Sequence, residues 1–339
     1  MIFKDTVFVL GAGASAHYGF PTGKTLVKNI TDLCSYDFHS NGRKKQMLID
    51  QMGYRQEQLY QFGDRLESSN VISIDRFLAQ QSESDRHLGK ILIALELLPI
   101  EELPIYSEDL DMPDLYKTLL NYLMPQGALS GIKNNRVTIV SFNYDRSLEH
   151  YLASSLSALY GASLAECYDY FTPWDGVDFK YPEIRHVHGS FGQLDGDSKL
   201  GGLMKYGSTD FSNGYPASII EKAAQNIRIV SEQSVGTNLE IIRNRINNAD
   251  QICFLGFSFD PENLHAIGLS HFGLAVSQID RNLNNNVLSH LCASRMGLED
   301  GEVKGIEADI MMPIRWADKV ANCEVAIREV FLRNQAMFE

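Results

Sequence analysis

Polar side chains that could act together in a reaction follow two apolar runs of the chain. Asn143 and Asp145 come directly after the run 137–142, and His188 lies at the end of the run that begins at Glu183. An amide can hold a hydroxyl group or a water in a fixed orientation, and a neutral imidazole can take a proton from either near pH 7. These three residues are therefore candidates for a site that orients and deprotonates a hydroxyl group or a water molecule.

The same positions also have simpler structural explanations. Asp145 stands just before a helix expected from Arg146 to Leu159, where an Asp commonly caps the first turn. His186 and His188 are two positions apart on a strand, so both imidazoles are expected to face the same side, as a structural pair or as metal ligands. No neighbouring Cys pair or H-E-x-x-H motif completes a metal site, and we expect no bound metal.

A glycine-rich segment, G-A-G-A-S-A at positions 11–16, follows the apolar run 6–10 and precedes a short helix expected from Ser15 to Tyr18. In dinucleotide-binding turns, the first glycine permits a tight turn and the second lets the backbone approach a pyrophosphate. The N–H groups at the start of the helix then bind the phosphates. A plain small-residue turn capped by Ser15 is the alternative. The candidate phosphate-binding residues are Gly11, Ala12, Gly13 and Ser15.

The chain after this turn departs from that of an ordinary dehydrogenase. A dehydrogenase continues into a second strand that ends in an acidic residue about 20 positions on, and this residue binds the ribose. Here the segment from Lys24 to Asp32 has the pattern of a helix, which leaves Asp32 poorly placed for that role. The sequence therefore disfavours hydride transfer.

A further polar segment follows the apolar run 251–255. Gly256 to Ser258 is expected to form another side of the same crevice, and Asp260 and Pro261 have the types expected of the cap and first residue of a helix. The motif is weak when taken alone. Like the other segments, however, it stands immediately after an expected strand.

The apolar runs predict the strands of a single sheet. Strands are expected at 6–10, 137–142, 183–188, 251–255 and 306–311, with helices between them and a last helix at 316–333. Strands that alternate with helices indicate an α/β fold, here a Rossmann-like parallel sheet. Because the carboxyl ends of such strands meet at one crevice, we expect the polar segments to meet there.

The hundred residues between the first two strands contain few strand signals. Helices are expected at 24–33, 46–65, 74–81, 87–98 and 113–124, with prolines between several of them. We therefore predict that residues 1–33 and 135–339 form the sheet domain and that residues 34–134 form a helical insertion.

Composition narrows the class of protein. The chain has 339 residues, 44% of them hydrophobic, and 30 basic against 43 acidic residues give a net charge of -13. This balance disfavours direct binding to nucleic acid or to an anionic membrane surface. The apolar stretch 91–100 is too short to span a membrane, and the run 6–10 is too short for a signal peptide. Because the five cysteines are scattered and form no C-x-x-C motif, we expect a soluble, cytoplasmic protein.

Taken in order, four short motifs resemble those of the sirtuin-like superfamily. They are Gly11–Ser15 with Gly19–Pro21, then Phe142–Asp145, then His188-Gly189, then Gly256–Ser258. More narrowly, the chain resembles the bacterial NAD-hydrolase branch that acts in antiphage defence, some of whose members work with a HerA-like ATPase. The resemblance covers roughly residues 1–30 and 135–265.

The resemblance implies an NAD-binding cleft. In it, the glycine segment would meet the pyrophosphate and the adjoining ribose, Asn143 and Asp145 would serve the nicotinamide ribose, and His188 would be the catalytic histidine. Asp75 resembles part of a short motif of the bacterial branch, with no role assigned. The remaining NAD-binding residues implied by the motifs are Phe20, Pro21, Gly256 and Ser258.

Two departures bear on the reaction. Protein deacylases of the superfamily follow the Gly-x-Pro with a Phe-Arg pair, whereas this chain continues from Pro21 into Thr22 and Gly23, and it lacks the cysteine pairs of their zinc module. Water is then the expected acceptor, which makes the expected activity NAD hydrolysis. The alternatives are a catalytically silent NAD-sensing or ADP-ribose-sensing module and a deacylase. The resemblance also implies gating, by homo-oligomerisation or by a HerA-like ATPase encoded nearby.

Overall fold

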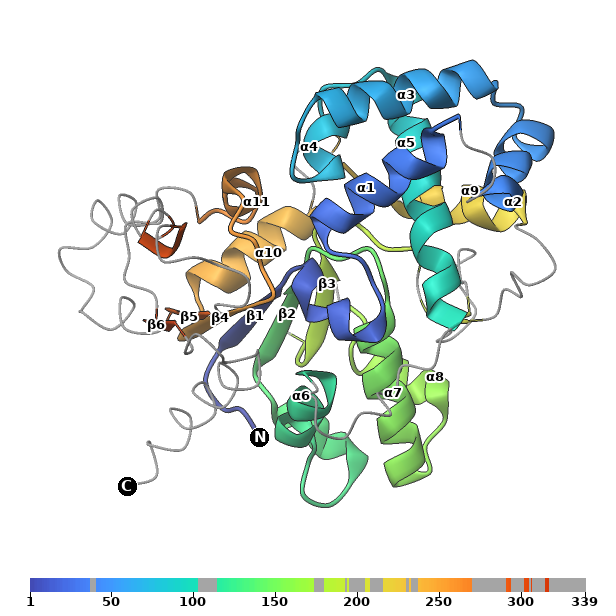
Figure 1. Cartoon of the computed structure of the whole chain (residues 1–339). Coiled ribbons are helices and arrows are strands. Elements are labelled where there is room, and N and C mark those ends of the chain that lie inside the picture. Colours follow the sequence, from blue (N-terminus) through green and yellow to red (C-terminus); the bar gives the residue numbers. More distant parts are fainter. Residues whose placement is uncertain are drawn as a thin grey trace.

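The centre of the molecule is a parallel sheet (Figure 1). The computed structural model describes residues 1–36, 41–102, 115–173, 180–192, 194, 205–207, 216–229, 232, 237–269, 291–293, 302–304, 306 and 315–316. The strands are β1 (Thr6–Leu10), β2 (Val137–Ser141), β3 (Glu183–His186), β4 (Gln251–Leu255), β5 (Leu291–Ala293) and β6 (Arg315–Trp316). Their order is β3-β2-β1-β4-β5-β6, and every neighbouring pair is parallel.

This strand order is that of a doubly wound dinucleotide-binding sheet, so the predicted α/β, Rossmann-like fold is confirmed. The order reverses at β1, which pairs with β2 on one side and with β4 on the other. The register aligns the strand ends, because Leu10 lies opposite both Ser141 and Leu255, and Ser141 lies opposite His186. The segments that follow these four strands therefore start side by side along one edge.

Apolar residues on both faces bury the sheet. In β1, Val7 and Val9 belong to a core cluster with residues of α10 (Thr237–Asn247) and α11 (Pro261–Ala266), whereas Phe8 and Leu10 belong to a second cluster. This alternation is the period of two of a strand. Strands buried on both faces need helices on both sides, and the predicted alternation of strands and helices supplies them.

Helices occupy the chain between β1 and β2. The described residues in this interval contain no strand and form α1 (Gly23–Cys34), α2 (Gly42–Gln46), α3 (Gln56–Ser68), α4 (Ile74–Leu78), α5 (Glu83–Leu97) and α6 (Leu115–Leu123). Later helices are α7 (Ser147–Tyr160), α8 (Leu164–Asp169) and α9 (Ala217–Asn226). Figure 1 shows α1 to α5 gathered with α9 beyond the carboxyl edge of the sheet.

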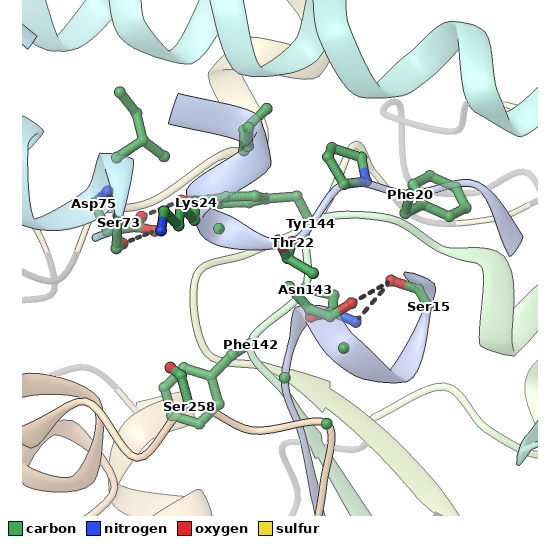
Figure 2. A pocket seen from close by; sticks show the side chains of 18 of the residues that line it. Ser15, Phe20, Thr22, Lys24, Ser73, Asp75, Phe142, Asn143, Tyr144 and Ser258 are labelled. Atoms are coloured by element: carbon green, nitrogen blue, oxygen red, sulfur yellow. Dashed lines mark hydrogen bonds between the residues drawn. The ribbon is translucent and has the colours of Figure 1, made fainter. Parts of the chain in front are cut away.

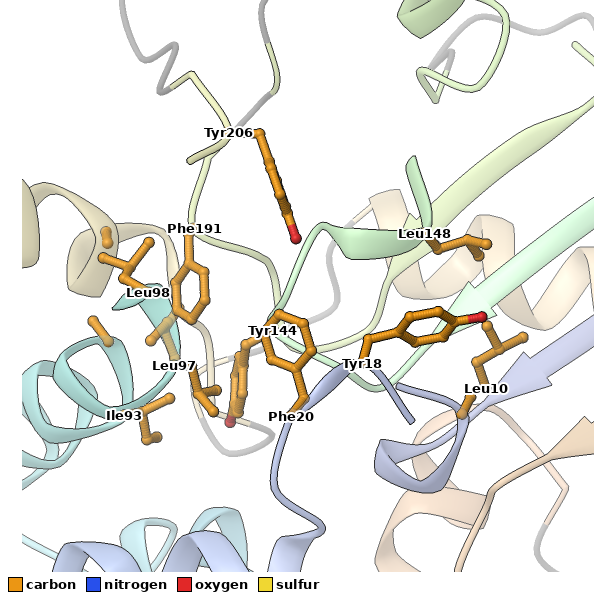
Figure 3. Packing of buried hydrophobic residues seen from close by; sticks show 14 of the residues in the cluster. Leu10, Tyr18, Phe20, Ile93, Leu97, Leu98, Tyr144, Leu148, Phe191 and Tyr206 are labelled. Atoms are coloured by element: carbon orange, nitrogen blue, oxygen red, sulfur yellow. The ribbon is translucent and has the colours of Figure 1, made fainter. Parts of the chain in front are cut away.

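We call α1 to α5 and α9 the helical layer. This layer and the sheet share a hydrophobic core. Figure 3 shows Tyr144, which follows β2, lying between Phe20 of the first loop and Leu97 of α5, and all three belong to the larger core cluster. Burial of these side chains holds the helical layer over the end of the sheet. The proposed boundaries of the helical insertion, at 34 and 134, stay a prediction.

Several element predictions need correction. The helix predicted at 46–65 is two helices, α2 and α3, separated by a turn of π-helix at Met47–Gln51 and by Gly53, whose positive φ of 75° ends the helical path. The short helix predicted at 15–18 is a pair of 3₁₀ turns, Ala12–Ala14 and Ala16–Tyr18. Strands β5 and β6 were not predicted, and Trp316, the expected start of the last helix, lies in β6.

Two further predicted elements fall largely on residues that the structure does not describe. Residues 307–311 of the fifth predicted strand and 317–333 of the last predicted helix lie outside the described residues. None of the helices in the described part of the chain is long and apolar enough to cross a membrane.

Candidate functional site

A cavity of about 390 Å³ lies at the carboxyl edge of the sheet, where the strand order reverses (Figure 2). The segments that follow β1, β2, β3 and β4 line it, together with the first turn of α1 and with α4. All the residues predicted from the sequence to form the site border this one cavity. They are Gly11, Ala12, Gly13, Ser15, Phe20, Pro21, Asn143, Asp145, His188, Gly256 and Ser258.

The glycines of the first and fourth segments pack against each other. The Gly13 N–H donates to the Gly256 carbonyl at 3.0 Å, and a Cβ built on Gly11 would lie 2.5 Å from the same oxygen. Gly256 has a φ of 58°, and a Cβ there would lie 2.2 Å from the Ala14 nitrogen. A contact between two backbones therefore requires these glycines. The Gly13 N–H, which belongs to the segment expected to bind phosphates, is already used within the protein.

The first turn of α1 is the stronger candidate for binding an anion. The glycine segment leads into 3₁₀ turns of three residues each, which lack the aligned dipoles of a longer helix. By contrast, α1 has 12 residues, and Thr22, Gly23 and Lys24 at its start line the cavity. These three residues were not predicted as site residues, although a helix start was expected at Lys24.

Asn143 has one half of its amide engaged. Its Nδ2 donates to the Ser15 hydroxyl at 3.2 Å, which joins the segments after β2 and β1 (Figure 2). Its Oδ1 is buried without a hydrogen-bond partner, and only 8% of the residue is exposed. A buried polar atom without a partner costs about 1 to 3 kcal/mol, which a bound ligand can offset with a hydrogen bond.

His188 also has a buried polar atom without a hydrogen-bond partner. The residue is 1% exposed, its Nδ1 has no hydrogen-bond partner, and its ring lies 5.4 Å from Phe142 and 5.9 Å from Tyr144. The following residue, Gly189, turns the chain with a φ of 68°, where a Cβ would lie 2.2 Å from the carbonyl of Asn226. The His-Gly pair therefore combines an imidazole on the cavity wall with a turn that only glycine fits.

His186 does not share the surroundings of His188, contrary to the sequence expectation that the two imidazoles face one side together. Strand β3 ends at His186, so the alternation does not extend to His188. The His186 ring contacts Glu149 of α7 through Nε2 and the Asn143 carbonyl through Nδ1, at 2.7 Å. Burial opposes protonation, but the ion pair with Glu149 and the contact with Asn143 raise the pKa of His186 above its usual value. His186 therefore supports the backbone of Asn143 from outside the cavity.

Asp145 holds the start of α7. Its Oδ1 accepts from the Ser147 N–H at 3.1 Å and from the Ser147 hydroxyl, one position outside the helix cap. The cap of α7 is Arg146, so Asp145 is not the cap that the sequence offered as an alternative. The Ser147 hydroxyl also lies 2.6 Å from the Tyr116 hydroxyl, which extends the network to α6. Burial raises the pKa of Asp145 to about 6, against the lowering effect of the bonds to Ser147.

This raised pKa predicts a pH-dependent cost in stability. A carboxyl group whose pKa is raised by folding opposes folding once the unfolded chain ionises. Wild-type stability should therefore fall as the pH rises from about 4 to about 6 and stay lower above that. An amide at this position does not ionise, so Asp145→Asn should gain about 1 to 3 kcal/mol relative to wild type between pH 4 and pH 7. Urea unfolding at both pH values measures this gain, and parallel pH profiles for the two proteins would contradict it.

Asp75 is a residue of the helical layer that lines the cavity. It lies on α4, its Oδ1 accepts from the Tyr144 hydroxyl, and its Oδ2 accepts from Ser73 at 3.2 Å (Figure 2). Tyr144 also lines the cavity and was not among the predicted site residues. Its place between Asn143 and Asp145 was the available signal.

The charge on the cavity wall is mixed. Among the described residues, Lys24 is the one Lys or Arg that lines the cavity, and the acidic residues are Asp75, Asp145 and Asp260. Asp260 also caps α11 through bonds to the N–H groups of Glu262 and Asn263, with Pro261 in the first turn, as predicted. This charge pattern suits a ligand that carries both an anionic and a cationic group better than a polyanion.

Among the residues that the structure describes, no three or more His, Cys, Asp or Glu side chains gather as a set of metal ligands. Cys34, Cys167 and Cys253 are buried and are not joined in disulfides. No model of a known protein family and no curated protein matches this chain.

Proposed function

We propose that the cavity binds NAD and that the protein hydrolyses the bond between nicotinamide and ribose. The observation that carries the proposal is the pair Asn143 and His188. Both line a cavity at the point where the strand order reverses, and each has a buried polar atom without a partner. Such atoms suit the hydroxyl groups and water of a hydrolytic site.

The cavity is large enough for a small molecule, and its charge suits a dinucleotide with a cationic ring. A volume of about 390 Å³ lies in the usual range of small-molecule sites. NAD carries an anionic pyrophosphate and a cationic pyridinium. The first turn of α1 with Lys24 would meet the former, and the acidic side chains would favour the latter.

Cleavage of the bond between nicotinamide and ribose depends mainly on how the protein positions the ribose and the water. Nicotinamide leaves as a neutral molecule from a cationic ring, so protonation of the leaving group adds little, and the protein must stabilise an oxocarbenium-like centre and deliver water. Asn143, fixed by Ser15, would orient the ribose or the water through its free Oδ1. His188 would take the proton from a ribose hydroxyl or from the water. Asp145 would add negative charge beside the cationic centre while it anchors α7.

Cleavage should depend on the charge of the ring. Purified protein should convert NAD to nicotinamide and ADP-ribose and leave NADH intact, because the dihydropyridine ring of NADH carries no positive charge and is a poor leaving group. Chromatography of timed reactions separates the products. Calorimetry that shows a stable one-to-one complex with NAD and no nicotinamide would favour the sensing module, and activity on an acylated peptide would favour a deacylase.

The biological role rests on the motif resemblance alone. We propose that the protein acts as an NAD-depleting effector in antiphage defence, in the sirtuin-like branch named above, with activity gated by self-assembly or by a HerA-like ATPase. An ungated NAD hydrolase would deplete its own cell of NAD. Assaying NAD loss with the protein alone and with the product of a neighbouring gene tests for a gating partner.

A further inference from the structure

The side chains of Asp75 and Tyr144 join two distant parts of the chain beside the proposed reaction centre. The Tyr144 hydroxyl donates to Oδ1 of Asp75 across 69 positions of sequence. The carboxylate is itself fixed, because Oδ2 accepts from the Ser73 hydroxyl at 3.2 Å and the Ser73 hydroxyl accepts from the Asp75 N–H at 3.2 Å. The helical layer therefore holds the Asp75 carboxylate in a fixed orientation, where it accepts a hydrogen bond from the segment that follows β2.

Tyr144 is a donor over the whole physiological pH range. The residue is 5% exposed, and burial followed by the charge of Asp75 raises the pKa of its phenol well above the usual value. The phenol therefore stays protonated, and the hydrogen bond to the carboxylate persists. A hydrogen bond from a neutral donor to a carboxylate is stronger than one between neutral groups.

Tyr144 connects this bond to both proposed reacting residues. It follows Asn143 directly in the chain, and its ring lies 5.9 Å from the ring of His188. The Asn143 amide is tied to Ser15 on one side, and its carbonyl meets His186 on the other. The bond to Asp75 attaches this segment to the helical layer.

The helix that carries Asp75, α4, lines the cavity and also contacts α11. Ile72 and Ser73, which precede α4, and Asp75 in its first turn all line the cavity, and Ile72 is 64% exposed. Arg76 lies 3.7 Å from Glu262 of α11 in an exposed ion pair. Contacts of α4 thus extend from the segment after β2 to the helix that follows β4.

We infer that Asp75 is a positioning residue: by holding the Tyr144 hydroxyl, it fixes Asn143 and His188 in the arrangement that the reaction needs. This inference rests on the proposed NAD hydrolysis. It gives the helical layer a defined part in the reaction, because a shift of α4 would move Tyr144 and with it the reacting groups. Small displacements of such groups cost large factors in rate.

Steady-state kinetics of nicotinamide release test the inference. Tyr144→Phe and Asp75→Ala should each lower kcat by about 10- to 100-fold, with little change in KM, because substrate binding is kept and alignment is lost. The double variant should be no slower than the slower single variant, because both changes break one interaction. Asp75→Asn keeps an acceptor oxygen and should recover part of the rate.

Asp85 provides a matched control. Like Asp75, it lies in the first turn of a helix with a capping serine, since Ser82 and Asp85 exchange bonds of 3.1 and 3.2 Å, but it does not line the cavity. Asp85→Ala should therefore leave kcat unchanged. If Asp75→Ala fails to fold, Tyr144→Phe decides by itself, because it removes a single oxygen.

The possible failures are distinguishable. Wild-type kcat in Tyr144→Phe, or a double variant slowed by the product of the two single effects, would overturn the positioning role while NAD hydrolysis stands. A rise in KM with kcat unchanged would also overturn it, because that result indicates direct contact with the substrate. A wild-type protein that releases no nicotinamide would instead overturn the proposed function.

Discussion

Replacing His188 by alanine is expected to lower the rate of nicotinamide release by about 10²- to 10⁴-fold, the usual contribution of a general base. Asn143→Ala should cause a loss of the same order, because the amide that orients the ribose or the water disappears. Both side chains line the cavity, and each has a buried atom without a partner. Removing them therefore removes few internal contacts, and both variants should fold.

The measurement is nicotinamide release at saturating NAD, with thermal unfolding as the check on folding. His17→Ala is the matched control. His17 is exposed beside the glycine segment and does not line the cavity, so its loss should leave the rate unchanged. Folded His188→Ala and Asn143→Ala proteins with full activity would remove these residues from the mechanism.

Replacing Glu183 by alanine is expected to lower the free energy of unfolding by about 3 to 5 kcal/mol, the usual cost of breaking a buried ion pair from one side. Glu183 is 0% exposed at the start of β3. Its two carboxylate oxygens accept from Arg185 at 2.8 Å and from Arg245 of α10 at 2.6 Å. Without this carboxylate, two buried guanidinium groups lose the ion pair that they share.

Urea unfolding of wild type and Glu183→Ala measures the loss. Arg65→Ala is the control, because the pair between Arg65 and Asp85 is exposed and should contribute less than about 1 kcal/mol. A loss at Glu183 no larger than that at Arg65 would show that the buried charges find other partners. Because β3 leads into His188, partial unfolding at Glu183→Ala should also lower activity.

The fold and the cavity wall could be predicted from the sequence where a short run of neighbouring residues determines the structure. A β-branched run that ends at glycine or at a polar residue marks both a strand and the place where its end must lie, so the sequence alone predicts that the segments at Gly11, Asn143, His188 and Gly256 meet at one edge. The cap at Asp260 was equally local. Strands β5 and β6 have three and two residues, too few to show a period.

What the sequence could not supply are contacts between distant residues. The packing of Gly13 on Gly256, the bond from Tyr144 to Asp75, and the pairing of Glu183 with Arg245 each join positions that only the folded chain brings together. These contacts change the interpretation of single residues. The glycines serve a contact between two backbones, and Asp75, whose role the sequence left open, contributes to the cavity wall.

Quantitative product analysis of NAD incubated with the purified protein, alone and with the product of a neighbouring gene, decides whether this cavity hydrolyses NAD. We expect nicotinamide and ADP-ribose, or a cyclised form of it, to appear in equal amounts as NAD disappears. We expect His188→Ala to yield neither at a comparable rate. NAD that stays intact under both conditions, although calorimetry shows it bound, would contradict hydrolysis at this site.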